Sequence, residues 1–424
     1  MGMYYRNAFL TIAASSTEDV NRPFLKARTR ISVIKAASES SKRKHFYLLW
    51  PGVDYNEMHV HELPFENEDG SSSTLHVRRI PEVSGTSITA NLPLASRGWT
   101  WQENILSTRI VHFTDSETIF ECRSQQRFEN GAVLQSNAGL TYRFSNSQDD
   151  MEHFWKSMVY DYSNRQLTYQ SDRLPAMSGV AAEIQNRTNS RYLAGLWYDW
   201  LQSDLLWSTL WEVGKAPEPK GPQEMPSWSW ASIRSRVSFE FDFCEQSKKG
   251  TTIRIESFDC EPKGLNPFGD VRPRSSITIR GLVFDATVVS NNILEWQTYR
   301  LLLNGEEFGR GMVYLKMDTI ISGVDVLNEK GVLTHTARRV SSSEALTTKP
   351  LKASVQCLHV GGGHYTSHSK HLGHMFKAHW FHQYYLILGA LPHQEGQIRS
   401  FSRIGFLRVD DRRPVGKRAT ITLY

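Results

Sequence analysis

The stretch Leu92-Pro-Leu-Ala-Ser-Arg-Gly-Trp-Thr-Trp-Gln-Glu-Asn-Ile-Leu-Ser-Thr-Arg-Ile-Val-His-Phe113 carries most of the information about the fold of this chain. Gly98 marks a turn, and two tryptophans and Glu103 follow at the start of a predicted helix. Arg109–Phe113 is then apolar and β-branched, as strands are, and together with Thr118–Cys122 it predicts a hairpin. The stretch therefore predicts a turn, a helix and a hairpin in direct succession.

Glu103 has two possible roles in this prediction. Thr100-x-x-Glu103 matches a capping box, in which the two side chains accept hydrogen bonds from free N–H groups at the start of a helix. The alternative is a catalytic carboxylate, because carboxylates stabilise the positive charge that develops on a sugar carbon during glycoside cleavage. The two roles are compatible, since a helix N-terminus favours an anionic group.

Two segments of the chain resemble the fungal heterokaryon-incompatibility (HET) domain. Ser96-Arg-Gly-Trp-Thr-Trp-Gln-Glu103 resembles its signature, and Tyr5-Arg-Asn-Ala-Phe-Leu-Thr-Ile-Ala-Ala-Ser15 resembles its central segment. In the family a long stretch precedes the central segment. We therefore expect the N-terminal half of the domain to be missing upstream of Met1, through truncation or a gene-model error.

HET domains also look distantly related to TIR domains, whose enzymatic members remove nicotinamide from NAD with a glutamate close to a Ser- and Trp-containing turn. The resemblance makes Glu103 the catalytic residue and implies that NAD is a substrate rather than a bound cofactor. It implies ligand contacts for Ser96, Arg97, Trp99 and Trp101. The chain differs from the family pattern at three positions in and just after the signature. Trp101 stands where Leu is usual, Asn104 where Arg is usual, and Thr108 where Pro is usual.

Further motifs resemble the region that follows the HET domain in many fungal proteins: Tyr162-Ser163, Leu167-Thr168, Ser171–Gly179, Ala194-Gly-Leu-Trp197 and Pro226-Ser-Trp-Ser-Trp230. The family acts in non-self recognition, in which incompatible fused cells are killed. The resemblance implies a death-triggering effector that is incomplete in this chain, and an NAD-cleaving enzyme if the missing half is restored. The alternative is a non-catalytic interaction or regulatory protein. Protein partners or self-association are expected in either case.

Composition narrows the class of protein. The 424 residues suffice for two to three domains. No apolar run is long enough to span a bilayer, and the four cysteines are widely spaced, so we expect a protein of the reducing cytoplasm. Basic residues gather between Lys26 and Lys44, but aromatic residues are not interleaved with them, so nucleic acid is not an expected partner.

The periodicity of apolar residues changes along the chain. Residues 150–222 are predicted to be helical, with helices around Trp155, after Pro175 and over Leu193–Leu205. Period-two patterns from Pro226 onward predict strands. The first of them places Trp228 and Trp230 on one face, so at least one of the two should be largely buried. The expected fold is α+β: a partial α/β, TIR-like HET remnant over 1–122, a helical region over 150–222 and a β-rich C-terminal domain over 226–424.

Histidines are concentrated near the end of the chain. Seven of the fifteen lie between His359 and His382, and neither Asp nor Glu falls within this run. A metal site needs three or four converging ligands, so we predict a surface loop and no metal. No Gly-x-Ser-x-Gly motif indicates a nucleophilic serine either.

Overall fold

The computed structural model describes residues 2–19, 21–25, 31–35, 58–67, 69–78, 92–115, 117–135, 148–210, 217–219, 225–240, 252–290, 299–308, 313–328, 330–341, 344, 351–371, 374–392, 399–410 and 414–424. The chain forms two compact units. The N-terminal unit comprises residues 1–145 with 165–167, and the C-terminal unit comprises 146–164 with 168–424. The expected helical and β-rich regions therefore share one compact unit. Among the described residues, no helix is long and apolar enough to cross a membrane.

The N-terminal unit contains a five-stranded sheet in the order β1-β5-β6-β7-β8. Its strands are β1 (Thr11–Ala13), β5 (Arg109–Phe113), β6 (Thr118–Cys122), β7 (Gln125–Phe128) and β8 (Val133–Gln135). β1 pairs with β5 in parallel, and the remaining pairs are antiparallel. The predicted hairpin of β5 and β6 is confirmed.

Strand β1 is more exposed than its composition indicates. The apolar and β-branched residues of Phe9–Ala14 are typical of a buried strand, but Phe9 is 81% and Ile12 is 65% exposed. Among the described strands, β1 pairs with β5 alone and forms the edge of the sheet. A strand is buried only where other strands flank it and another layer of the protein covers it. The apolar composition of the strand alone does not show whether these neighbours are present.

The other elements of this unit are two helices, a short 3-10 helix and a second sheet. The helices are α1 (Gly2–Asn7), η1 (Pro93–Ser96) and α2 (Gly98–Leu106). The second sheet contains β2 (Ile31–Lys35), β3 (Met58–Glu66) and β4 (Ser72–Arg78), with β2 parallel and β4 antiparallel to β3.

The C-terminal unit begins with helices and short strands: α3 (Gln148–Tyr162), η2 (Gln170–Asp172), η3 (Pro175–Met177), α4 (Ser178–Thr188), β9 (Tyr192–Leu193), β10 (Leu196–Trp197), η4 (Tyr198–Trp200), α5 (Leu201–Asp204), β11 (Trp207–Leu210), β12 (Glu218–Pro219), η5 (Trp230–Ser232), β13 (Ile233–Arg234) and β14 (Arg236–Phe239). The helices around Trp155 and after Pro175 are confirmed. β11 pairs with β14, and β12 pairs with β13.

The helix predicted over Leu193–Leu205 was wrong in its first part, and only the residues of η4 and α5 at its end are helical. β9 and β10 form a tight hairpin in the first part, with positive φ at Ala194 (46°) and Gly195 (96°). A side chain at Gly195 would meet Trp230, because a Cβ atom would lie 2.6 Å from the indole nitrogen. The apolar residues recur at helical spacing, but the left-handed turn ends any helix.

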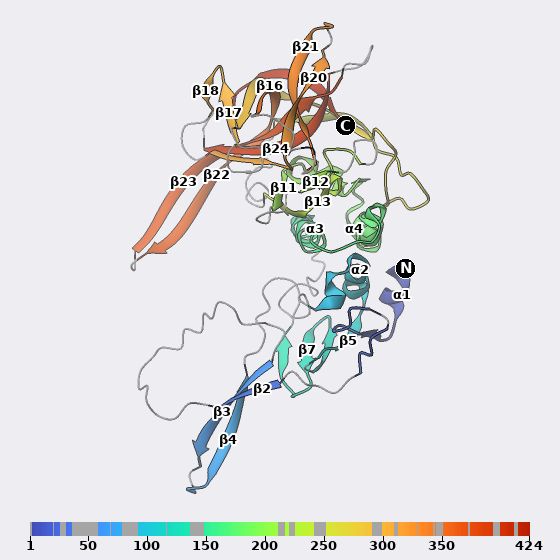
Figure 1. Cartoon of the computed structure of the whole chain (residues 1–424), viewed down its shortest axis with the longest axis vertical. Coiled ribbons are helices and arrows are strands. Elements are labelled where there is room, and N and C mark those ends of the chain that lie inside the picture. The colour runs from blue at the N-terminus through green and yellow to red at the C-terminus, as the bar shows by residue number, and fades with distance from the viewer. Residues whose placement is uncertain are drawn as a thin grey trace. The chain divides into compact units, whose positions relative to one another are not determined.

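An eleven-stranded sheet completes the C-terminal unit (Figure 1). Its strands are β15 (Arg254–Asp259), β16 (Ser276–Ser290), β17 (Arg300–Leu303), β18 (Glu306–Glu307), β19 (Val313–Met317), β20 (Ile321–Leu327), β21 (Leu333–Arg339), β22 (Leu351–His371), β23 (His374–Ala390), β24 (Ser400–Asp410) and β25 (Lys417–Leu423). β16 pairs with both β25 and β22, so β16, β22, β23, β24 and β25 close into a ring. The apolar residues on its inner face, among them Phe284, Cys357, Ile387 and Leu407, form the core. The predicted β-rich C-terminal region is confirmed.

The histidine run lies on strands, so the predicted surface loop was wrong. It covers the second half of β22 and the first half of β23, which pair with each other from Gly361–Tyr384 to His371–His374. This two-stranded ribbon extends away from the rest of the sheet (Figure 1). His359 is buried at its base, where its ring contacts the Thr252 hydroxyl and the Gln383 amide oxygen, both at 2.7 Å.

Candidate functional site

Helix α2 begins one turn earlier than the capping box requires. The residue before it is Arg97, whose side chain makes no capping bond, and Thr100 lies inside the first turn. The Thr100 hydroxyl donates back to the carbonyl oxygens of Leu94 and Arg97, at 2.7 and 2.8 Å. The predicted capping box was therefore wrong, and Glu103 lies in the middle of the helix instead.

The segment 165–167 fixes the start of α2. Gln166 accepts a hydrogen bond from the Gly98 N–H and donates one to the Ser96 carbonyl, both at 2.7 Å. A Cβ atom at Gly98 would lie 2.3 Å from the Leu167 side chain. The turn before α2 therefore needs glycine because of this close approach, and the Gln166 carbonyl satisfies the first N–H group of the helix.

Glu103 is half-buried and faces the Tyr5 hydroxyl of helix α1. Burial raises the pKa of the Glu103 carboxyl, while the hydrogen-bonding interaction with Tyr5 and the positive charge of Arg97 act in the opposite direction. Burial and the neighbouring carboxylate also raise the pKa of Tyr5. A partly desolvated carboxylate is suited to stabilising a cationic centre, because its charge is weakly screened by water.

The four other predicted site residues differ in accessibility. Ser96 and Arg97 are exposed, and the Ser96 hydroxyl donates to the Pro93 carbonyl at 2.7 Å. Trp99 is half-buried, whereas Trp101 is fully buried in the unit. Only Trp99 of the two tryptophans therefore presents a ring surface that a ligand could contact, and Trp101 serves the packing of α2.

A polar arrangement that the sequence did not reveal joins strands β5 and β6 of the same unit to Ser15, which lies after β1. The Ser15 hydroxyl lies 3.0 Å from Nδ1 of His112 on β5, and Nε2 of that ring lies 3.3 Å from Oε2 of Glu121 on β6. These residue types resemble a catalytic triad, but each side chain is at most 5% exposed. A nucleophile must reach its substrate. The arrangement instead connects the residue that follows β1 to the centre of the sheet.

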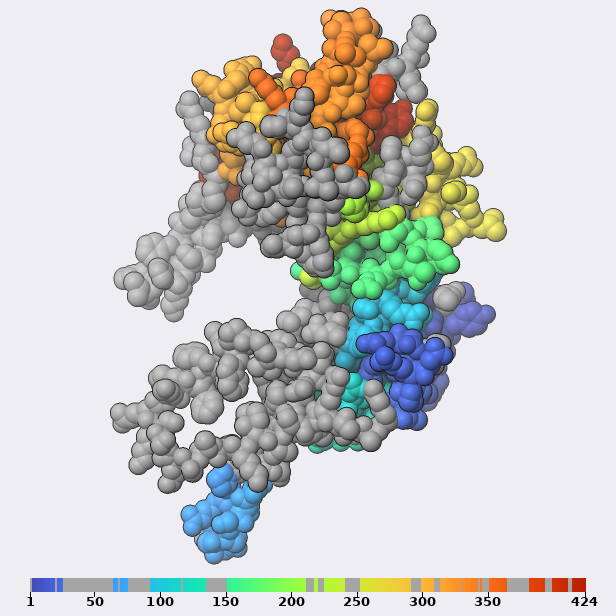
Figure 2. Space-filling view, viewed as in Figure 1, coloured from blue at the N-terminus to red at the C-terminus, as the bar shows by residue number. Residues whose placement is uncertain are grey.

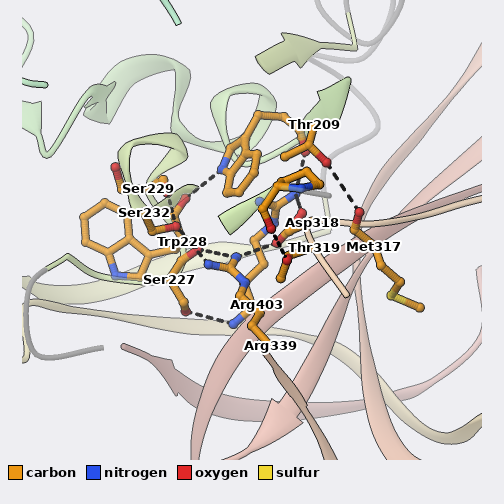
Figure 3. Close-up of polar contacts among 12 residues, drawn as sticks. Thr209, Ser227, Trp228, Ser229, Ser232, Met317, Asp318, Thr319, Arg339 and Arg403 are labelled. Carbon is orange, nitrogen blue, oxygen red and sulfur yellow. Dashed lines mark hydrogen bonds and ion pairs between the residues drawn. The ribbon is translucent and has the colours of Figure 1, made fainter. Parts of the chain in front are cut away.

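A second buried polar cluster holds the C-terminal unit together (Figure 3). The Asp318 carboxylate pairs with the guanidinium groups of Arg339 and Arg403, and all three side chains are at most 8% exposed. Arg403 also lies 3.5 Å from the ring centre of Trp207, while Arg339 donates to the Ser232 hydroxyl at 2.8 Å. Burial lowers the pKa of Arg403 to about 9. The cluster thus connects Trp207 and Ser232 to the residue after β19, to the end of β21 and to β24.

Two carboxylates share one ammonium group elsewhere in the core of this unit. Lys156 Nζ lies 2.7 Å from Glu152 Oε1 and 3.7 Å from Asp204 Oδ1, with all three side chains buried. Burial raises the pKa of Asp204 to about 7; the charge of Lys156 opposes this rise and that of Glu152 adds to it.

Asp204 is therefore expected to make stability depend on pH. Its folded pKa of about 7 exceeds the ordinary 3.8, so folding favours the protonated form, and this contribution is lost as the pH rises through about 7. We expect the free energy of unfolding to fall as the pH rises from about 4 to about 7, and to fall less in Asp204→Asn. Urea unfolding across this range measures the effect, with the exposed Asp199→Asn as the control. Parallel pH profiles for wild type and Asp204→Asn would contradict it.

Metal ligation finds no support within the described part of the chain, where no three His, Cys, Asp or Glu side chains gather in a way that could hold an ion. Of the four cysteines, Cys122, Cys260 and Cys357 are free thiols, and Cys244 lies outside the described residues. Most of the basic stretch from Lys26 to Lys44 also lies outside them.

Comparisons of the chain with protein-family models, curated proteins and solved structures found no significant match.

Proposed function

We propose that this chain acts in fungal non-self recognition as an effector of cell death, with Glu103 as the carboxylate that promotes cleavage of NAD. The observation that carries the proposal is the position of Glu103. Glu103 lies in the middle of α2 and not at a capping position, and its carboxylate is half-buried beside Tyr5 with a raised pKa. The resemblance of Ser96–Glu103 to the HET signature supplies the reaction.

In the proposed step, the bond between C1′ of the nicotinamide ribose and the pyridinium nitrogen breaks. Nicotinamide leaves with the bonding electron pair, and positive charge develops on C1′. The Glu103 carboxylate stabilises that charge or orients the ribose hydroxyls. Water then adds to C1′ and releases a proton, which gives ADP-ribose. The exposed Arg97 supplies a positive charge for the diphosphate, and Trp99 supplies a ring face for stacking.

Glu103→Gln tests this proposal, because glutamine keeps the shape and the hydrogen-bond acceptor for Tyr5 but removes the charge. We expect NAD consumption and killing of the host cell to be lost, with little change in melting temperature. NAD is measured in fungal cells that express either the chain or an N-terminally extended form of it, for which the family resemblance implies the activity, and nicotinamide release is measured with both purified proteins. Tyr5→Phe is the matched control, since it removes the partner of Glu103 and leaves the carboxylate.

A non-catalytic interaction role is the second candidate, and exposed apolar side chains favour it. Met3 on α1 is 75% exposed, and Phe9 and Ile12 beside and on β1 are exposed to a similar degree. Exposed apolar groups of this kind mark protein contacts. Cell killing that persists unchanged in Glu103→Gln would reject the catalytic proposal and favour this one.

A further inference from the structure

A pocket of about 570 Å³ lies in the C-terminal unit, apart from every residue discussed above. Its floor consists of β16 and β22. Phe284 and Cys357 of these strands point into the core, so their neighbours Asp285 and Gln356 point to the opposite face. The pocket is therefore built on the outer, polar side of the closed ring of strands.

Cross-strand pairs of polar residues form this floor. Asp285 pairs with Gln356, whose amide donates to Oδ1 of the carboxylate at 2.8 Å, and Thr287 pairs with Ser354. Hydroxyl and amide groups thus lie side by side on a rigid sheet. Such groups can donate to and accept from the hydroxyls of a bound molecule without reorganising.

The walls add positive charge and apolar surface. Lys330 lies in the turn between β20 and β21, and Arg399 lies just before β24; both are exposed. Leu327, also on the rim, is 54% exposed. Asn328 fixes the turn, because its Oδ1 accepts from the N–H groups of Lys330 and Val332, both at 2.9 Å. The β20–β21 hairpin, in orange, stands out from the surface of this unit (Figure 2).

We propose that this pocket binds a phosphorylated small molecule of the size of a nucleoside monophosphate. The volume lies in the range typical of small-molecule sites, roughly 300–1,000 Å³. Among the described residues that line the pocket there are two cations and one carboxylate, and that carboxylate is already bonded to Gln356. The phosphate lies between Lys330 and Arg399, the sugar hydroxyls face the polar floor, and the base rests against the leucines of the wall. This site does not depend on Glu103 or on the proposed reaction.

Isothermal titration calorimetry of the full chain with AMP, adenosine and inorganic phosphate tests the proposal. We expect AMP to bind more tightly than either of its parts, because the site recognises the phosphate and the nucleoside together. Lys330→Ala should weaken AMP binding about tenfold, since it removes a charge-assisted hydrogen bond. Thr287→Val should weaken AMP binding less than Lys330→Ala does. Added salt should weaken the binding of AMP to the wild type, because salt screens the charges of the site.

Lys263→Ala is the matched control, because Lys263 is an exposed lysine of the same unit that does not line the pocket. It should leave AMP binding unchanged. Three results would overturn the proposal: no heat of binding with AMP, equal affinity for AMP and adenosine, or equal affinity of Lys330→Ala and Lys263→Ala. Inorganic phosphate that binds as tightly as AMP would also overturn it, since the floor would then contribute nothing.

Discussion

Replacing Asp318 with alanine is expected to destabilise the C-terminal unit by about 3–5 kcal/mol, because it leaves two buried guanidinium groups without a counter-charge. Asp318 is 1% exposed and pairs with Arg403 at 3.1 Å and also with Arg339. The two arginines cannot reach water without unpacking Trp207, which lies over Arg403. The measurement is urea unfolding followed by tryptophan fluorescence.

Asp325→Ala is the control for this prediction. Asp325 pairs with His335 at 2.7 Å, but both side chains are more than half exposed. Exposed ion pairs contribute only about 0–1 kcal/mol, so this variant should unfold close to wild type. Similar unfolding midpoints for Asp318→Ala and Asp325→Ala would show that the buried cluster contributes little to stability.

Where the sequence predicted the fold correctly, the signal was local. Alternation over Ser276–Val283 indicated a strand that the structure contains, because a half-buried strand repeats every two residues. The segment Pro226–Ala231 also alternates. At least one of Trp228 and Trp230 was predicted to be largely buried, and both are fully buried. The segment is nevertheless a turn followed by a 3-10 helix, so the expected strand was wrong. Burial of alternate residues does not require an extended backbone.

The candidate site was predictable only in part. The motif identified Glu103, but its neighbour Tyr5 and the residue that fixes the start of its helix, Gln166, are far away in the sequence. No spacing rule relates Ser15 to His112, or Asp318 to Arg403, because each pair meets through the pairing of distant strands. The local sequence pattern therefore identified Glu103, whereas its burial and its neighbours depend on tertiary contacts that the pattern does not predict.

Trp230 connects two sequence motifs of the C-terminal unit, Ala194–Trp197 and Pro226–Trp230. Its indole N–H donates to the Gly195 carbonyl at 2.8 Å, and Trp155 donates to the same oxygen at 3.0 Å. The Ser229 hydroxyl donates to the neighbouring Ala194 carbonyl. The Trp230 ring also lies 5.2 Å from the guanidinium of Arg173, a buried cation whose pKa burial lowers to about 10. The side chain therefore packs the β9–β10 turn and shields Arg173.

Trp230→Ala is expected to cost about 3–5 kcal/mol of unfolding free energy, because it opens a cavity and removes the aromatic face beside a buried cation. Trp230→Phe should cost clearly less, since it keeps most of the ring and Trp155 still bonds to the Gly195 carbonyl. Tyr198→Ala is the control, as Tyr198 is an aromatic residue of the same unit that is 42% exposed. Chemical unfolding followed by far-ultraviolet circular dichroism measures all three. If Trp230→Ala unfolds at the same denaturant concentration as Tyr198→Ala, the β9–β10 turn does not depend on this side chain, and the packing described for Trp230 is incorrect.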